Sequence, residues 1–179
     1  LKEKYNKPGN VYLGLVHRLD RPVGGVMVFA KTSKAASRLS KSITTNDFHK
    51  TYYAVVTGNL KKEDKLVDYL KKDPKNNMSY VTNSKEGKLS ILTYNLVAKK
   101  DNLNLVKINL LTGRSHQIRV QFASRNNPLV GDQKYNIKEK NNTQIALFAQ
   151  SITFPHPTTK ELLTYTLPLP NRYPFNIFK

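Results

Sequence analysis

A single acid stands between two arginines in the segment His-Arg-Leu-Asp-Arg, where Arg18 and Arg21 flank Asp20. A Pro/Gly turn and an apolar stretch follow at once. Neighbouring cations favour the charged form of a carboxyl group. A charged carboxylate suits a nucleophile or an electrostatic group better than a general acid. Taken alone, however, these residues fit a structural salt bridge at a turn more readily than an active site.

A second candidate is the segment TGRSHQIRVQFA at residues 112–123, whose apolar spacing predicts a helix. On that helix His116 and Arg119 share one face, and Ile118 and Phe122 share an adjacent apolar face. Arg119 would then leave the helix close to the packed interior, where a cation needs an anionic partner. The alternative is an arginine that extends along the surface to solvent.

Two adjacent tyrosines, Tyr52 and Tyr53, lie in a β-branched and aromatic run that predicts a strand at residues 50–58. Neighbouring side chains of a strand point to opposite faces, so at most one of them can face a given site. Packing in the core or across strands is the commoner role for such tyrosines.

Several enzyme classes find no support in the sequence. The four histidines lack zinc-ligand spacing, and the chain has no cysteine. It contains no Gly-rich phosphate loop and no Gly-x-Ser-x-Gly segment. A glycosidase needs two carboxylates facing one bond, whereas the acids of residues 63–68 have the pattern of a solvated face. The sequence therefore predicts no metal site.

Charge is the strongest global feature: 30 Lys and Arg against 12 Asp and Glu give a formal net charge of +18. Such an excess predicts a polyanionic partner, nucleic acid first and an anionic membrane surface second. A Lys- and Asn-rich genome would explain part of it, but would not by itself deplete the acids. No apolar run has the length of a membrane span or the pattern of a signal peptide. We expect a cytoplasmic protein.

The remaining pattern predicts many strands and two helices. Ser33 is the expected N-cap of a helix at residues 32–47, and a second helix is expected at residues 115–127. Strands are expected at the following ranges: 14–19, 24–31, 50–58, 78–82, a hairpin at 89–113 that breaks at 100–102, 144–154 and 161–169. This order predicts an α+β fold with a mixed, mostly antiparallel sheet and flanking helices, in one domain over residues 1–179.

Four segments, in order from about His17 to Leu167, resemble the motifs of the RluA-type pseudouridine synthases. They are HRLD followed by GVMVFAKT, HKTYYAVVTG, LLTGRSHQIRVQFASRNNPLVGDQKY and LFAQSITFPHPTTKE. Two positions depart from the usual pattern: Val23-Gly24 replaces Thr-Ser, and Phe148 replaces a histidine. We expect these differences to affect substrate preference more than activity.

The resemblance implies the pseudouridine synthase catalytic fold and isomerisation of uridine to pseudouridine in ribosomal or transfer RNA, without cofactor, metal or hydrolytic water. It implies that Asp20 acts at the ribose, as a nucleophile giving a ribosyl ester or as a base giving a glycal. Tyr52 would stack on the extruded base and help to remove its C5 proton. Arg119 would pair with Asp20 and keep it ionised.

The resemblance also implies a group of residues that bind the RNA around the reacting nucleotide, with Arg18 placed to fill the vacated base stack. The expected RNA-binding residues are His17, Arg18, Lys50, Arg114 and His116. Family domains usually begin several dozen residues earlier, so we expect this chain to lack the N-terminal edge of the domain and any S4 appendage. We expect a monomer.

Two alternatives from other classes remain. A non-catalytic basic RNA-binding or ribosome-associated protein would share the charge but would not need Asp20, Tyr52 and Arg119 together. A membrane-surface protein would need an amphipathic helix with bulky apolar residues, and the helix expected near residues 33–46 is rich in Ala and Ser instead.

Overall fold

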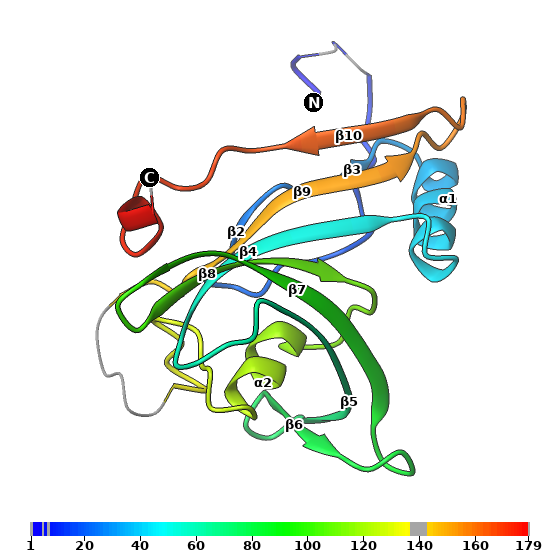
Figure 1. Cartoon of the computed structure of the whole chain (residues 1–179). Helices are drawn as coiled ribbons and strands as arrows, with labels where there is room; N and C mark the ends of the chain where they lie inside the picture. The colour runs from blue at the N-terminus through cyan, green and yellow to red at the C-terminus, as the bar shows by residue number, and fades with distance from the viewer. Residues whose placement is uncertain (1, 5, 7, 137–142, 179) are drawn as a thin grey trace.

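The computed structural model of the chain describes residues 2–4, 6, 8–136 and 143–178. Its main sheet has the strand order β10-β9-β4-β8-β7-β5-β6, with antiparallel neighbours throughout, and β2 adds a parallel pairing to β9. A separate antiparallel pair joins β1 and β3 (Figure 1). The predicted mixed, mostly antiparallel α+β fold is therefore confirmed.

The strands are β1 (Gly14–Leu15), β2 (Gly24–Gly25), β3 (Phe29–Ala30), β4 (His49–Thr57), β5 (Glu63–Asp73), β6 (Met78–Thr82), β7 (Lys88–Lys100), β8 (Leu103–Leu110), β9 (Leu147–Pro155) and β10 (Leu162–Thr166). The helices are α1 (Ser33–Thr44), α2 (Gln117–Ala123) and a 3₁₀ turn, η1 (Phe175–Phe178). Among the residues described, no helix has the length and apolar character needed to cross a membrane.

Helix α1 packs at one end of the sheet through the apolar stripe that its sequence predicted. Leu39 is buried, and Ala36 and Ile43 pack around the same cluster, which includes Phe154 of β9. The predicted N-cap was wrong by one residue. Thr32, in an extended conformation, accepts a hydrogen bond from the Ala35 N–H at 3.1 Å, and Ser33 already belongs to the helix.

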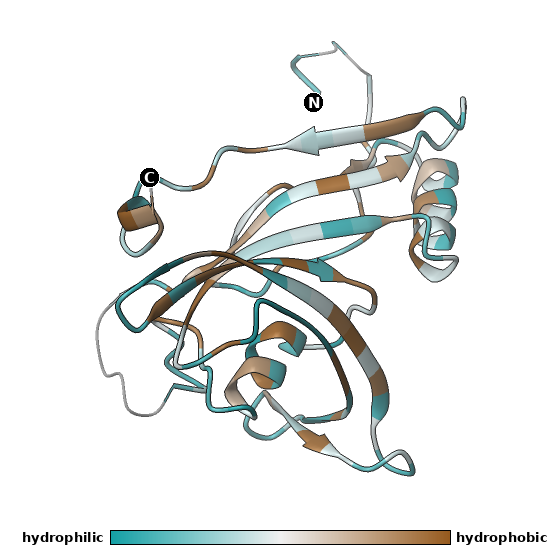
Figure 2. Cartoon of the chain, viewed as in Figure 1, coloured by the Kyte–Doolittle hydropathy of each residue, from teal (hydrophilic) through white to brown (hydrophobic). Residues whose placement is uncertain are grey.

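The two faces of the central strand β4 separate its tyrosines, as predicted. Tyr52 belongs to the apolar cluster that contains Ile118 and Phe122 of α2. Tyr53 packs against a different cluster on the other face, around Val55. Figure 2 shows hydrophobic and hydrophilic residues mixed along the strands of the sheet. Tyr52 is therefore the tyrosine that lies on the α2 side of the sheet.

The acidic stretch at residues 63–68 is not merely a solvated face: it begins the long strand β5, which the sequence analysis missed. Only Leu66 and Leu70 of β5 are buried, so its pattern lacks the strict alternation that identifies a strand. Asp68 of β5 forms an ion pair with Arg125 at 2.8 Å. Strand β6 and the β7–β8 hairpin occur where they were predicted.

Helix α2 lies inside the curve formed by β7, β5 and β6 (Figure 1). It is shorter than the predicted helix at residues 115–127, because His116 precedes it in a left-handed conformation with φ of 53°. Ile118 and Phe122 are buried in the core, as predicted. Arg119 follows Ile118 and is also buried, with 4% of its surface exposed.

The Asp20 turn is attached to the sheet by β2. The Val23 N–H donates to the Asp20 carbonyl at 2.8 Å, and the Val26 N–H donates to the Ala149 carbonyl at 2.9 Å. Between these bonds Gly25 adopts φ of 134°, and a Cβ there would collide with the backbone of Ala149. This glycine lets the chain approach β9 closely enough to fix the turn.

We expect Gly25→Ala to lower the free energy of unfolding by at least about 2 kcal/mol, because a side chain is strained at this φ and has no space. Gly24→Ala is the matched control. Its Cβ would meet Phe148 at 3.7 Å, an ordinary contact, so we expect a change within about 0.5 kcal/mol. Urea denaturation measures both, and equal losses would contradict the assignment.

Candidate active site

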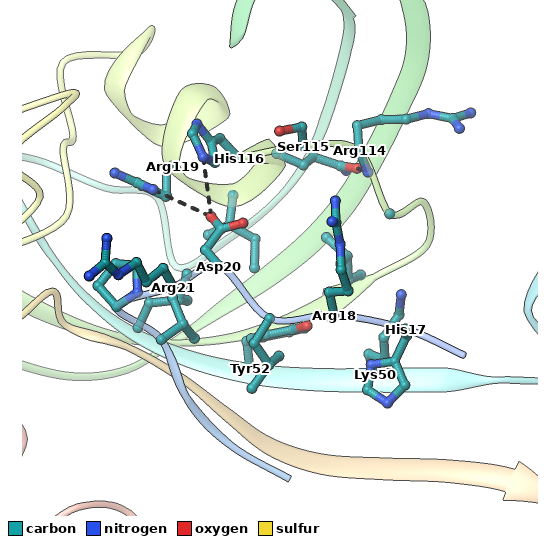
Figure 3. A pocket seen from close by; sticks show the side chains of 18 of the residues that line it. His17, Arg18, Asp20, Arg21, Lys50, Tyr52, Arg114, Ser115, His116 and Arg119 are labelled. Carbon is teal, nitrogen blue, oxygen red and sulfur yellow. Dashed lines mark hydrogen bonds and ion pairs between the residues drawn. The ribbon is translucent and has the colours of Figure 1, made fainter. Parts of the chain in front are cut away.

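A cleft of about 1330 Å³ opens between the Asp20 turn, β4 and the loop that leads into α2. All eight residues predicted for the site line this cleft, although they come from three separate segments of the chain. Figure 3 shows Asp20 pointing toward α2, with Tyr52 on the opposite wall. The fold thus brings the candidate residues together.

Asp20 and Arg119, 99 residues apart in the sequence, meet in this cleft. Arg119 Nη1 lies 3.4 Å from Asp20 Oδ2. His116 Nε2 lies 4.0 Å from the same oxygen. The Asp20 side chain is 28% exposed, whereas that of Arg119 is 5% exposed. The carboxylate therefore faces the cleft, and the arginine holds it from the interior.

Arg119 has a stronger partner that the sequence analysis did not identify. Its Nε and Nη2 donate to the two carboxylate oxygens of Asp132 at 2.8 and 2.6 Å. The Asp132 side chain is fully buried. Burial acts to lower the pKa of Arg119, but the hydrogen bonds and charge of Asp132, together with Asp20, outweigh it and raise that pKa. The requirement that a buried arginine be paired was the sequence argument that could have pointed to a second acid such as Asp132.

Tyr52 presents a neutral phenol to the cleft. Burial, and secondly the negative charge of Asp20, raise the pKa of Tyr52 to about 12. The phenol therefore keeps its proton near neutral pH, and its ring offers a flat apolar surface beside the carboxylate.

His17 and Lys50 lie together on the Phe48 side of the cleft. The Val28 N–H donates to His17 Nε2 at 3.1 Å, and the His17 ring packs at a tilt on Phe48. Burial, and secondly the charge of Lys50, lower the pKa of His17 to about 4. Burial also lowers the pKa of Lys50. His17 thus holds the backbone as a neutral group, whereas Lys50 brings its side-chain nitrogen to the cleft wall.

The cleft is strongly cationic. Arg18 and Arg21 are exposed at the Asp20 turn, and Arg114 donates from Nε to the Leu89 carbonyl at 3.0 Å. Among the described lining residues, Asp20 is the one acid, against seven Lys and Arg: Arg18, Arg21, Lys50, Lys72, Arg114, Arg119 and Lys134. No group of three or more His, Asp or Glu side chains in the described part of the chain could hold a metal ion.

The sequence model of the RNA pseudouridylate synthase family matches residues 1–124. The chain belongs to this family. A ribosomal large subunit pseudouridine synthase C of Buchnera aphidicola is 37% identical to it, over 91% of this chain and 55% of that protein. An uncharacterized RNA pseudouridine synthase of Helicobacter pylori is 32% identical, over 94% of this chain and 52% of that protein. The chain thus spans about half the length of these relatives.

Solved structures of the family share the fold. The human RNA pseudouridylate synthase domain containing 1 protein superposes with a TM-score of 0.78 at 22% identity, over 93% of this chain and 72% of that one. The human domain containing 4 protein gives a TM-score of 0.73 at 20% identity, over 88% and 72%. The fold of the family therefore extends over nearly the whole chain.

The two acids that contact Arg119 should differ in their effect on stability. We expect Asp132→Asn to lower the free energy of unfolding by about 3 kcal/mol or more, because it removes the charge from a buried pair. Asp20→Asn should change it by less than about 1 kcal/mol, because Asp20 is partly solvated and makes the longer contact. Urea denaturation measures both. Losses of equal size would show that Arg119 depends equally on the two acids.

His17 should make the stability of the fold depend on pH. Its pKa is about 4 in the fold and 6.5 when unperturbed, so the neutral ring stabilises the fold fully above pH 6.5 and loses this effect as the pH falls toward 4. The difference is on the order of 3 kcal/mol. His17→Gln keeps an acceptor for the Val28 N–H without titrating.

We therefore expect urea denaturation of His17→Gln to show a smaller fall in stability between pH 6.5 and pH 4 than the parent protein shows. His49→Gln, at an exposed histidine of β4, is the matched control and should retain the parent's pH dependence. A parental dependence in His17→Gln would contradict the assigned role of the ring.

Proposed function

We propose that this chain is the catalytic part of an RNA pseudouridine synthase, which isomerises uridines of structured RNA to pseudouridine through Asp20. One observation carries the proposal: the single acid among the described residues of a cationic cleft lies at 3.4 Å from a buried arginine, on the wall opposite a neutral tyrosine. Family membership supports the same reaction.

The charge of the cleft supports RNA as the substrate. Lysines and arginines at a cleft mouth bind phosphates without reading the sequence. Lys50, Arg18 and Arg114 are positioned around the cleft for this purpose. A stacked uridine is out of reach, so the nucleotide must be extruded at a cost of a few kcal/mol. The exposed Arg18 is the side chain we assign to the vacated stack.

In the proposed reaction the bond between C1′ of the ribose and N1 of uracil breaks. The uracil turns in the cleft, C5 bonds to C1′, the C5 proton leaves, and N1 gains a proton. Asp20 acts as a charged group at the ribose, either bonding to C1′ or removing a proton from C2′. All atoms of the uridine are retained, so the reaction needs no external group.

Tyr52 stacks on the extruded uracil in this proposal. With its pKa at about 12, the phenol is not a base on its own near neutral pH. Removal of the C5 proton through Tyr52 therefore requires an acceptor for the phenol proton, and Asp20 is the negative charge that acts on this tyrosine. Tyr52 and Asp20 would then work as a pair after the new bond has formed.

The relatives, rather than the site, support a choice of RNA. Several relatives, among them the Buchnera aphidicola protein, are described as ribosomal large subunit pseudouridine synthases. We therefore infer ribosomal RNA as the first candidate and transfer RNA as the second, with action in the cytoplasm. We also propose that the protein acts as a monomer.

We expect Asp20→Asn to form no detectable pseudouridine while it binds RNA within about threefold of the parent affinity, because the cationic cleft remains intact. The assay is release of tritium from C5-labelled uridine in ribosomal RNA transcripts, and filter binding measures affinity. Lys160→Asn, at an exposed residue outside the cleft lining, is the control and should retain activity.

The two outcomes that would contradict the proposal point to different conclusions. Tritium release by Asp20→Asn at the parent rate would show that another group is responsible for the chemistry. RNA binding without turnover by the unmodified chain, on both ribosomal and transfer RNA, would favour a non-catalytic RNA-binding protein.

A further inference from the structure

Tyr135, which the reaction proposed above does not use, joins strand β6 to the cleft. Its hydroxyl oxygen lies 2.7 Å from the backbone nitrogen of Ser79 and 2.8 Å from His116 Nδ1. The Arg119 guanidinium lies over the Tyr135 ring, 5.1 Å from its centroid. Tyr135 therefore contacts both Arg119 and His116, the two residues that approach Asp20.

The direction of these hydrogen bonds follows from their chemistry. A backbone N–H can only donate, so the Tyr135 oxygen accepts from Ser79 and the phenol proton is left for His116 Nδ1. A neutral imidazole that accepts at Nδ1 carries its own proton on Nε2. The chain of contacts thus favours one tautomer of His116, the one in which the Tyr135 proton also has a partner.

The surroundings of His116 favour its neutral ring. Burial is the main cause that lowers its pKa, and the charges of Arg119 and Lys134 act in the same direction. Asp20 and Asp132 oppose them without reversing the shift. A hydrogen bond from the Tyr135 hydroxyl further favours the neutral ring of His116, because it requires Nδ1 to be unprotonated.

Both groups that approach Asp20 contact the same oxygen. Arg119 Nη1 lies 3.4 Å from Oδ2, and His116 Nε2 lies 4.0 Å from Oδ2 (Figure 3). Within the described part of the chain, Oδ1 has no hydrogen bond or ion pair. Catalytic hydrogen bonds in unliganded sites are often long and tighten only in the substrate complex. Arg119 therefore bonds to one carboxylate oxygen, His116 Nε2 lies beside that same oxygen beyond hydrogen-bond distance, and the other oxygen is open to the cleft.

We propose that His116 is a positioning residue, fixed as the neutral Nε2–H tautomer by Tyr135, which holds Asp20 Oδ2 together with Arg119 so that Oδ1 is the reacting oxygen. This inference rests on the proposed function for its catalytic consequence. The tautomer itself does not depend on that function, which allows the two to be tested separately.

The first test is ¹⁵N NMR of the histidine-labelled chain at pH 7, without RNA. We expect His116 to show an unprotonated, hydrogen-bonded Nδ1 and a protonated Nε2. In Tyr135→Phe the phenol proton is lost, so we expect a mixture of tautomers and a pKa of His116 closer to its ordinary value. A charged ring or an Nδ1–H tautomer in the parent chain would overturn the inference, whatever the activity.

The second test measures single-turnover rate and RNA affinity. We expect Tyr135→Phe to slow turnover by between about 10- and 100-fold, because Asp20 is less firmly oriented, with affinity unchanged. Tyr165→Phe, at an exposed tyrosine of β10, is the matched control and should keep the parent rate. An unchanged rate in Tyr135→Phe would overturn the role.

A double variant separates positioning from a merely structural effect of Tyr135. The amide of His116→Gln can donate to Asp20 and has no tautomers, so we expect it to retain more turnover than His116→Ala. In the His116→Gln background, Tyr135→Phe should cost little further rate. An undiminished cost there would mean that Tyr135 acts only through the fold, and would overturn the inference. Failure of the unmodified chain to turn over would instead count against the proposed function, because the NMR result is independent of it.

Discussion

The buried guanidinium of Arg119 is the constraint on which the site depends. A charge in the core of a domain must be paired. This guanidinium contacts two carboxylates, one more closely than the other. Asp132 takes the bidentate position at 2.8 and 2.6 Å, whereas Asp20 receives the remaining nitrogen at 3.4 Å. The first contact is fully buried and fixes the arginine, and the second lies at the cleft wall. The same side chain thus belongs to the core and to the site.

Helix α2 and the loop that precedes it hold this arginine in place. Ile118 and Phe122 anchor α2 in the core, so Arg119 leaves the helix where solvent cannot reach it. Gln117, also buried, accepts from the Arg114 N–H at 3.0 Å and donates to the Ile91 carbonyl at 3.1 Å, which ties the preceding loop to β7. The left-handed residue His116 stands between that loop and the helix. A short helix can therefore position a charge because its first turn is held from several sides.

The spacing of apolar residues in the sequence predicted most helices and strands. The features that it missed depend on contacts between distant segments of the chain. The β7–β8 hairpin and α1 were predictable because their apolar residues repeat at the period of a strand and a helix. Strand β5 was not, because it buries only Leu66 and Leu70 and carries charges elsewhere. The motifs brought Asp20, Tyr52 and Arg119 to attention, but Asp132 became visible only through its distances. No rule of spacing states which of two acids will occupy the fork of a buried arginine.

The unequal sharing of Arg119 has a chemical consequence for the proposed reaction. When a guanidinium group binds both oxygens of a carboxylate, strong charge-assisted hydrogen bonds occupy both oxygens. Because Asp132 occupies the fork, Asp20 keeps an oxygen free of such contacts within the described structure while it still lies beside a positive charge. In the proposed function, the other Lys and Arg side chains of the cleft would bind phosphates, in keeping with the net charge of +18. Under the proposed function, Asp132 would support the reactivity of Asp20 by pairing with two of the three guanidinium nitrogens of Arg119, although Asp132 does not itself line the cleft.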